Sequence, residues 1–100
     1  MYKFKETKRA LKDWQKIKSM SQSGKERWKE IFKNILNSPR DKKAIGNPEE
    51  LKHTYIEVWS RELSRKDRIV YGIEPGVNYD MPDELEIIVF YQYLGHYADK

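Results

Sequence analysis

The segment from residue 46 to residue 74 carries most of the side chains that could do chemistry. It reads GNPEELKHTYIEVWSRELSRKDRIVYGIE, a turn followed by two stretches in which apolar and polar residues alternate. Among the apolar residues are the carboxylates Glu49 and Glu50, the imidazole of His53, and the guanidinium groups of Arg61 and Arg68. Carboxylates and imidazoles can move protons, and guanidinium groups bind anions. We therefore ask which elements of the fold position these groups.

Composition indicates a single domain over residues 1–100. A chain of 100 residues with 38% hydrophobic and 13% aromatic residues suits one compact core. The sequence contains no cysteine, which excludes a disulfide framework and thiolate chemistry. It shows neither an apolar leader nor an apolar run long enough to span a bilayer, so we expect a soluble cytoplasmic protein with no membrane partner.

The net charge of +4 conceals an uneven distribution. Residues 1–43 hold 14 Lys and Arg against 5 Asp and Glu, a balance of +9, whereas residues 44–100 hold 6 against 11, a balance of −5. A basic surface attracts polyanions, of which nucleic acid is the commonest in a cell. A solvated helix face that only keeps the protein soluble is the alternative.

The first half predicts a short strand at residues 2–4 and two antiparallel helices. Helical spacing of apolar residues begins near Ala10, and Ser23 with Glu26 matches a capping box that would open the second helix before Pro39 ends it. The two apolar stripes, which we expect to pack on a sheet, are Leu11, Trp14, Ile17 and Met20, then Trp28, Ile31, Phe32, Ile35 and Leu36.

The second half predicts the sheet. Residues 54–63 and 67–73 are rich in β-branched and aromatic residues, and a connection of hairpin length separates them. A loop over residues 74–83 leads to residues 84–94, the most apolar segment and the expected central strand. The predicted fold is α+β, with an N-terminal strand and two antiparallel helices packed on one face of a mainly antiparallel, twisted sheet.

Four short motifs resemble one family. GNPEELKH at 46–53, WSREL at 59–63, DRIVY at 67–71 and HY at 96–97 resemble the pattern of YoeB/Txe toxins in the RelE/ParE superfamily, in the same order and at nearly the same spacing. The resemblance implies a RelE-like fold in a bacterial type II toxin. It also implies a cognate antitoxin of the YefM/Axe kind, and cleavage of mRNA in the ribosomal A site without metal or cofactor. A homodimer is left open.

The resemblance also implies roles for individual residues. RNA cleavage of this kind needs a base for the ribose 2′-hydroxyl, an acid for the leaving 5′-oxygen and cations for the phosphate. By position in the motifs, Glu49 is the base, with its neighbour Glu50 as the alternative if the register slips by one. Arg68 binds the phosphate, His96 is the acid, and Tyr97 orients the phosphate or stacks on a base.

Secondary contacts follow from the same motifs. Strand alternation puts Arg68 on one face with Gly72, which we expect to leave room for a phosphate. Arg61 would add a second cation, unless it pairs with a carboxylate such as Glu57. We expect Lys52 and His53 to be structural or to contact substrate, as we do Trp59. The helix lysines expected to hold ribosomal RNA include Lys8, Lys12, Lys16 and Lys29.

The chain departs from the family pattern at three places. Glu62 follows Arg61 where a second basic residue is common, and Asp67 replaces the histidine of the H-R-L-V-Y motif. Leu94 and Gly95 separate the last strand from His96, and Gly95 is a candidate for the bend that returns His96 to the site.

Two other functions stay open. A ParE-like toxin that inhibits gyrase would share the fold but would not need an acid, a base and an arginine in one site. A non-catalytic module that binds RNA or the ribosome would need only the basic helices and the aromatic residues Tyr91, Tyr93 and Tyr97.

Overall fold

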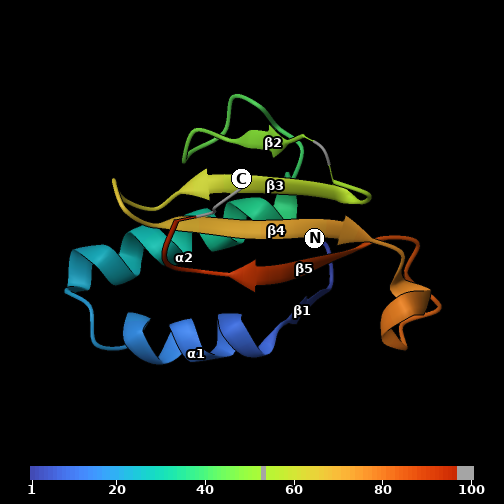
Figure 1. The fold of residues 1–100 in the computed structure, drawn as a ribbon, viewed down its shortest axis with the longest axis horizontal. Helices are drawn as coiled ribbons and strands as arrows, with labels where there is room; N and C mark the ends of the chain where they lie inside the picture. Colours follow the sequence, from blue (N-terminus) through green and yellow to red (C-terminus); the bar gives the residue numbers. More distant parts are fainter. Residues whose placement is uncertain (53, 97–100) are drawn as a thin grey trace.

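The computed structural model describes residues 1–52 and 54–96, and its elements form an α+β domain (Figure 1). Two helices follow a first strand, and four further strands complete a five-stranded sheet. The elements are β1 (Phe4–Glu6), α1 (Lys8–Ile17), α2 (Gln22–Asn37), β2 (Glu49–Leu51), β3 (Glu57–Glu62), β4 (Arg68–Glu74), the 3₁₀ helix η1 (Gly76–Tyr79) and β5 (Ile87–Gln92).

The strand order in the sheet is β1-β5-β4-β3-β2. β1 pairs with β5 in parallel, and the other three pairs are antiparallel. β4 is therefore the middle strand, and the prediction that the last apolar segment is central was wrong by one place. That segment is nevertheless an interior strand, because β5 lies between β1 and β4.

The helices begin at side-chain caps. The Thr7 hydroxyl accepts the N–H of Ala10 at 3.1 Å, so α1 starts at Lys8. The Ser21 hydroxyl accepts the N–H of Gly24 at 3.2 Å, so Ser21 caps α2 and the predicted cap at Ser23 was wrong. Figure 1 shows α1 leaving β1 and α2 returning behind the sheet, which confirms the antiparallel pair.

Both helices bury their stripes against one face of the sheet. The core joins Ile17, Ile31 and Ile35 to Tyr71 and Phe90 of the sheet. The Phe32 ring lies 4.8 Å from that of Trp28 and 4.9 Å from that of Phe90, measured between centroids. Of the predicted stripe residues, Leu11 is the exception, because its side chain is 48% exposed.

Strand alternation divides the sheet residues between two faces. Trp59, Tyr71 and Phe90 are paired across the strands and face the helices. The residues between them face the opposite way, and we call that side the distal face. In β2, β3 and β4 the distal face carries Glu49, Leu51, Val58, Ser60, Glu62, Arg68, Val70, Gly72 and Glu74.

Candidate functional site

Glu49 lies on a strand that the sequence did not predict. The chain turns at Gly46 and Asn47, which have φ angles of +88° and +53°, and then pairs Glu49 with Ser60 of β3. A side chain at position 46 would meet the Cβ of Arg61 at 3.2 Å, which explains the glycine there. Glu49 is therefore an exposed carboxylate at the edge of the distal face.

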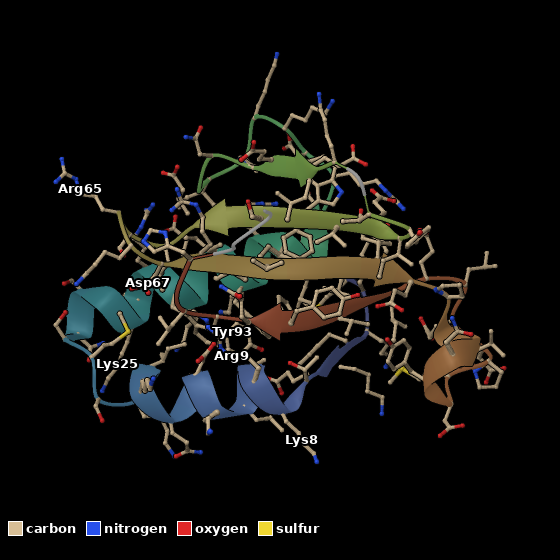
Figure 2. The ribbon with its side chains drawn as sticks, viewed as in Figure 1. Lys8, Arg9, Lys25, Arg65, Asp67 and Tyr93 are labelled. Carbon is tan, nitrogen blue, oxygen red and sulfur yellow. The ribbon has the colours of Figure 1, made fainter. Side chains whose placement is uncertain are left out.

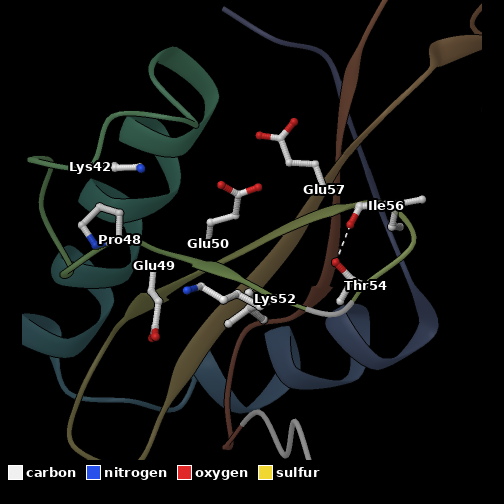
Figure 3. A pocket seen from close by; sticks show the side chains of 9 residues that line it. Lys42, Pro48, Glu49, Glu50, Lys52, Thr54, Ile56 and Glu57 are labelled. Carbon is white, nitrogen blue, oxygen red and sulfur yellow. Dashed lines mark hydrogen bonds between the residues drawn. The ribbon is translucent and has the colours of Figure 1, made fainter.

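Glu49 and Glu50 point to opposite sides of β2. Glu50 pairs with Trp59, so it shares the side of the sheet that faces the helices, whereas Glu49 shares the distal face with Arg68. Figure 3 shows the two carboxylates on opposite sides of the ribbon, with Lys52 pointing toward Glu49. The geometry thus places the two candidates for the base on opposite faces of the sheet. It favours Glu49, because only Glu49 shares a face with Arg68.

A cleft of about 730 Å³ lies along β2. Its walls include Glu49, Glu50, Glu57, Lys42 and Lys52 (Figure 3). Arg68 and His96 do not line it. The cleft is therefore a groove beside the proposed base, and the other expected catalytic groups lie farther across the sheet.

Arg68 begins β4 and keeps a partly exposed guanidinium on the distal face. Its side chain is 28% exposed, and its Nη1 donates to the carbonyl of Ser64 at 3.2 Å. Its Nη2 lies 3.4 Å from a carboxylate oxygen of Glu62, the residue paired with it across β3 and β4. Glu62, which stands where the family commonly has a basic residue, therefore forms an ion pair with Arg68, the residue expected to bind phosphate.

Gly72 does not leave space for a phosphate. A Cβ built at position 72 would lie 2.4 Å from the hydroxyl oxygen of Tyr91. The Tyr91 ring fills that space, and its hydroxyl donates to the buried carboxylate of Glu74, which also accepts from Tyr79 at 2.9 Å. Burial, with these hydrogen bonds to Glu74, raises the pKa of Tyr91 well above its usual range, so the phenol stays a donor.

His96 lies beside Arg68. The backbone N–H of Arg68 donates to the carbonyl of Gly95 at 2.9 Å, and Gly95 adopts a φ of +94° that turns the chain. The side chain of His96 is exposed. The expectation that Gly95 supplies a bend is confirmed, and the structure brings two of the expected catalytic residues together at one end of β4.

Glu49 remains apart from this pair. It lies on β2, two strands away from β4, and is offset by two residues along the strands, so about 10 Å across the sheet and about 7 Å along it separate its backbone from that of Arg68. The long side chains of both residues lie on the distal face and can reach toward a strand of RNA laid across it. Tyr97 and His53 lie outside the described residues.

Arg61 corrects the prediction of a second phosphate-binding cation. Its side chain is fully buried, and its guanidinium donates to the Asn34 side chain at 2.7 Å and to the carbonyls of Ile45 and Ser38 at 2.9 and 3.0 Å. A guanidinium held in this way cannot contact RNA. The expected pairing with Glu57 was also wrong, because Glu57 binds Arg40 at 2.8 Å.

The sequence contained a signal for this placement. Arg61 alternates with Trp59 and Leu63, which are both buried, so strand periodicity assigns all three to the core side. The guanidinium is tolerated there because carbonyl and amide oxygens satisfy it. Trp59 is likewise buried, and its indole N–H donates to Glu57 at 2.8 Å.

The basic residues of the helices are on the surface. The expected RNA-binding lysines Lys8, Lys12, Lys16 and Lys29 are all exposed. Figure 2 shows Lys8 pointing outward from α1, away from the sheet. No helix in residues 1–52 and 54–96 is long and apolar enough to cross a membrane. In the same residues, no three His, Asp or Glu side chains cluster as metal ligands would.

Sequence reasoning missed two residues of α1 that reach the end of β5. Asp13 is 3% exposed and accepts the backbone N–H of Tyr93 at 3.0 Å, and Arg9 donates to the carbonyl of Leu94 at 2.7 Å. Their spacing of four is that of a helical ion pair, and Arg9 does contact Asp13 at 3.1 Å. Nothing in that spacing indicates that the pair also binds the chain 80 residues away.

Comparisons with known proteins give the same fold. The structure is similar to the YoeB/ParE toxin from Agrobacterium tumefaciens, with a TM-score of 0.74 and 22% identity over 95% of this chain and 99% of that chain. It is also similar to the YoeB dimer from Staphylococcus aureus (TM-score 0.71, 21% identity, 96% and 98%) and to the heterotetrameric YoeB-YefM toxin-antitoxin complex from the same organism (0.69, 20%, 97% and 99%).

These likenesses, at 22% identity or less, show that the chain has the fold of the YoeB and RelE structures. Residues 6–97 match the model of the YoeB-like toxins of bacterial type II toxin-antitoxin systems. The protein belongs to that YoeB-like family, which confirms the resemblance read from the four motifs. A search of curated proteins found no significant match.

Proposed function

We propose that this toxin is a metal-independent endoribonuclease that cleaves mRNA in the ribosomal A site. The observation that carries the proposal is the distal face, which presents an exposed carboxylate at Glu49 and a partly exposed guanidinium at Arg68, with the exposed residue His96 next to Gly95, whose carbonyl accepts the Arg68 N–H. Membership of the YoeB-like toxins supports it.

In this mechanism the RNA supplies its own nucleophile. The Glu49 carboxylate takes the proton of a ribose 2′-hydroxyl, whose oxygen then attacks the adjacent phosphorus. Arg68 binds the non-bridging oxygens and stabilises the charge that develops on them. The His96 imidazolium gives a proton to the departing 5′-oxygen, so the products carry a 2′,3′-cyclic phosphate and a 5′-hydroxyl. Tyr97 orients the phosphate or stacks on a base, and Lys52 and His53 contact the RNA.

Ribosome dependence follows from the openness of this site. The backbones of Glu49 and Arg68 are separated by about 10 Å across the sheet and about 7 Å along it. The cleft beside Glu49 does not extend to Arg68 or His96. A free RNA has nothing to hold its 2′-oxygen in line, and the ribosome supplies that orientation. The exposed lysines of α1 and α2, including Lys8, Lys12, Lys16 and Lys29, bind ribosomal RNA.

The partners follow from the relatives. A YoeB relative forms a complex with YefM, and another structure holds a YoeB dimer. We infer that a YefM-like antitoxin neutralises this toxin and that the free toxin can form a homodimer.

The test is expression of the toxin in bacteria that lack the antitoxin. Growth should arrest, mRNA ends should map inside codons, and purified ribosomes should be required for cleavage in vitro. Intact transcripts with inhibited gyrase would support the ParE-like alternative instead. Ribosome binding without any RNA cleavage would support the non-catalytic module.

A further inference from the structure

The backbone of residues 93–95, which we call the 93–95 turn, is held by two carboxylates from different parts of the chain. Asp13 of α1 accepts the N–H of Tyr93 at 3.0 Å and that of Leu94 at 3.2 Å. Asp67, one residue before β4, accepts the N–H of Gly95 at 2.7 Å. Three successive N–H groups therefore donate to side-chain carboxylates, which bind such groups more strongly than neutral acceptors do.

The carbonyl groups of the 93–95 turn are satisfied as well. Arg9 donates to the carbonyl of Leu94 at 2.7 Å, and the backbone N–H of Arg68 donates to that of Gly95 at 2.9 Å. The Gln92 side chain donates to both carbonyls at 3.1 Å. Figure 2 shows Arg9, Asp67 and Tyr93 in the region where α1, β4 and the end of β5 meet. The turn is thus fixed from three directions.

Hydrogen bonds outside the 93–95 turn also orient Asp67. The Ser64 hydroxyl donates to its second carboxylate oxygen at 3.2 Å, and its own N–H donates back to that hydroxyl at 3.2 Å. Its carbonyl accepts the N–H of Leu63 at 3.0 Å. The connection between β3 and β4 therefore presents the carboxylate in one orientation.

The turn also depends on the glycine at position 95. Its φ of +94° is a conformation that other residues adopt only with strain. A Cβ at this position would lie 2.8 Å from Nη2 of Arg9. Both observations indicate that the 93–95 turn requires glycine at position 95. His96 follows the turn directly in the chain.

We propose that Asp67 and Asp13 are positioning residues that hold the 93–95 turn and thereby place His96 beside Arg68. The proposal rests on the proposed function, in which His96 is the general acid. This proposal gives two of the departures from the family pattern a common structural role. The residues Leu94 and Gly95 separate His96 from β5, and Asp67, standing where the family has a histidine, binds Gly95 and returns His96 to the end of β4.

The experiment compares Asp67→Ala and Asp67→Asn with the unchanged toxin on programmed ribosomes. Asp67→Ala should lower the single-turnover cleavage rate by about tenfold to a hundredfold, the scale expected for a displaced catalytic group, while ribosome affinity is unchanged. Asp67→Asn keeps an acceptor at the same place and should restore most of the rate. Asp41→Ala is the matched control, because Asp41 also accepts a backbone N–H, that of Lys43 at 2.9 Å, in an exposed turn elsewhere.

A second readout follows His96 itself. The chain has two histidines, so the imidazole signals in a proton–carbon NMR spectrum can be assigned with a single His53→Gln variant. The His96 signals should move toward those of an unfolded peptide in Asp67→Ala and in Gly95→Ala, and stay in place in Asp41→Ala. Circular dichroism verifies that each variant is folded.

The outcomes separate this proposal from the proposed function. Unchanged His96 signals in folded Asp67→Ala and Gly95→Ala overturn the positioning role, whatever happens to the cleavage rate. Displaced His96 signals with an unchanged rate support the positioning role and overturn His96 as the general acid. Displaced signals with a reduced rate support both.

Discussion

A carboxylate oxygen of Glu62 lies 3.4 Å from Nη2 of Arg68, across the pair of strands that carries the distal face. The two residues are 42% and 28% exposed at their side chains, so water screens the attraction and the pair is weak. In the proposed mechanism, RNA phosphate competes with Glu62 for the same guanidinium. We therefore expect the ion pair to lower the affinity of the proposed site for RNA without preventing binding.

Removal of the Glu62 charge should make the toxin more active. Since an exposed ion pair contributes at most about 1 kcal/mol, Glu62→Gln should raise the cleavage rate at subsaturating ribosomes by roughly twofold to fivefold. Single-turnover cleavage measures the change, with Glu30→Gln on the exposed face of α2 as the control. A lower rate in Glu62→Gln would show that the carboxylate orients Arg68 productively.

The two faces of β2 predict a sharp contrast between adjacent carboxylates. Glu49→Gln should lower the single-turnover rate by about two to four orders of magnitude with ribosome affinity intact, because proton transfer contributes nothing to binding in the ground state. Glu50→Gln, on the opposite side of the strand, should change the rate little. The reverse result would assign the base to Glu50 and contradict the geometry of the edge strand.

Buried Arg61 should govern stability. Arg61→Met leaves the Asn34 side-chain oxygen and the Ile45 carbonyl without this donor, and the Ser38 carbonyl with only the N–H of Asp41; each orphaned acceptor costs about 1 to 3 kcal/mol. Urea unfolding should show a loss of about 3 kcal/mol or more, whereas Arg65→Met at an exposed position should show little change. Normal stability of Arg61→Met together with weakened RNA binding would restore the substrate role.

The lysines of the helices should determine the salt dependence of ribosome binding. Each phosphate contact contributes roughly one unit to the slope of log affinity against log salt concentration. Lys12→Glu, Lys16→Glu and Lys29→Glu combined should lower that slope by about three units and weaken binding steeply at low salt. A slope equal to that of the unchanged toxin would identify the helix charges as a solvated face.

Alkaline pH should destabilise the fold through Tyr93, which is buried, and Tyr91, which is half-buried. Burial and the bonds to Glu74 and Glu6 raise the pKa values of Tyr91 and Tyr93 in the folded state, whereas an unfolded tyrosine ionises near pH 10. The stabilisation is complete below about pH 10 and is lost as pH rises from there toward the folded pKa values. The free energy of unfolding between pH 9 and pH 11 should fall less steeply in Tyr93→Phe. Equal slopes in the two proteins would exclude this cause.

Periodicity alone predicted the parts of the fold that depend on burial. The stripe of α2 and the three long strands follow directly from the spacing of apolar residues. The sequence did not predict β2, because its three residues, two of them glutamates, show no alternation of apolar and polar residues. They form a strand only by pairing with β3. The space beside Gly72 was misjudged because Tyr91, its occupant, lies on another strand. Contacts between distant segments, such as Asp13 with Tyr93, leave no local signal in the sequence.

The parallel pairing of β1 with β5 also has a kinetic consequence. Phe4 lies opposite Ile88, so the first strand to leave the ribosome waits unpaired until the chain has been synthesised through β5. The helices and the antiparallel strands β2, β3 and β4 can form earlier from local contacts, but β5 and the turn after it, which leads to His96, join them late. The proposed site, which includes His96, is therefore assembled only after β5 has been synthesised.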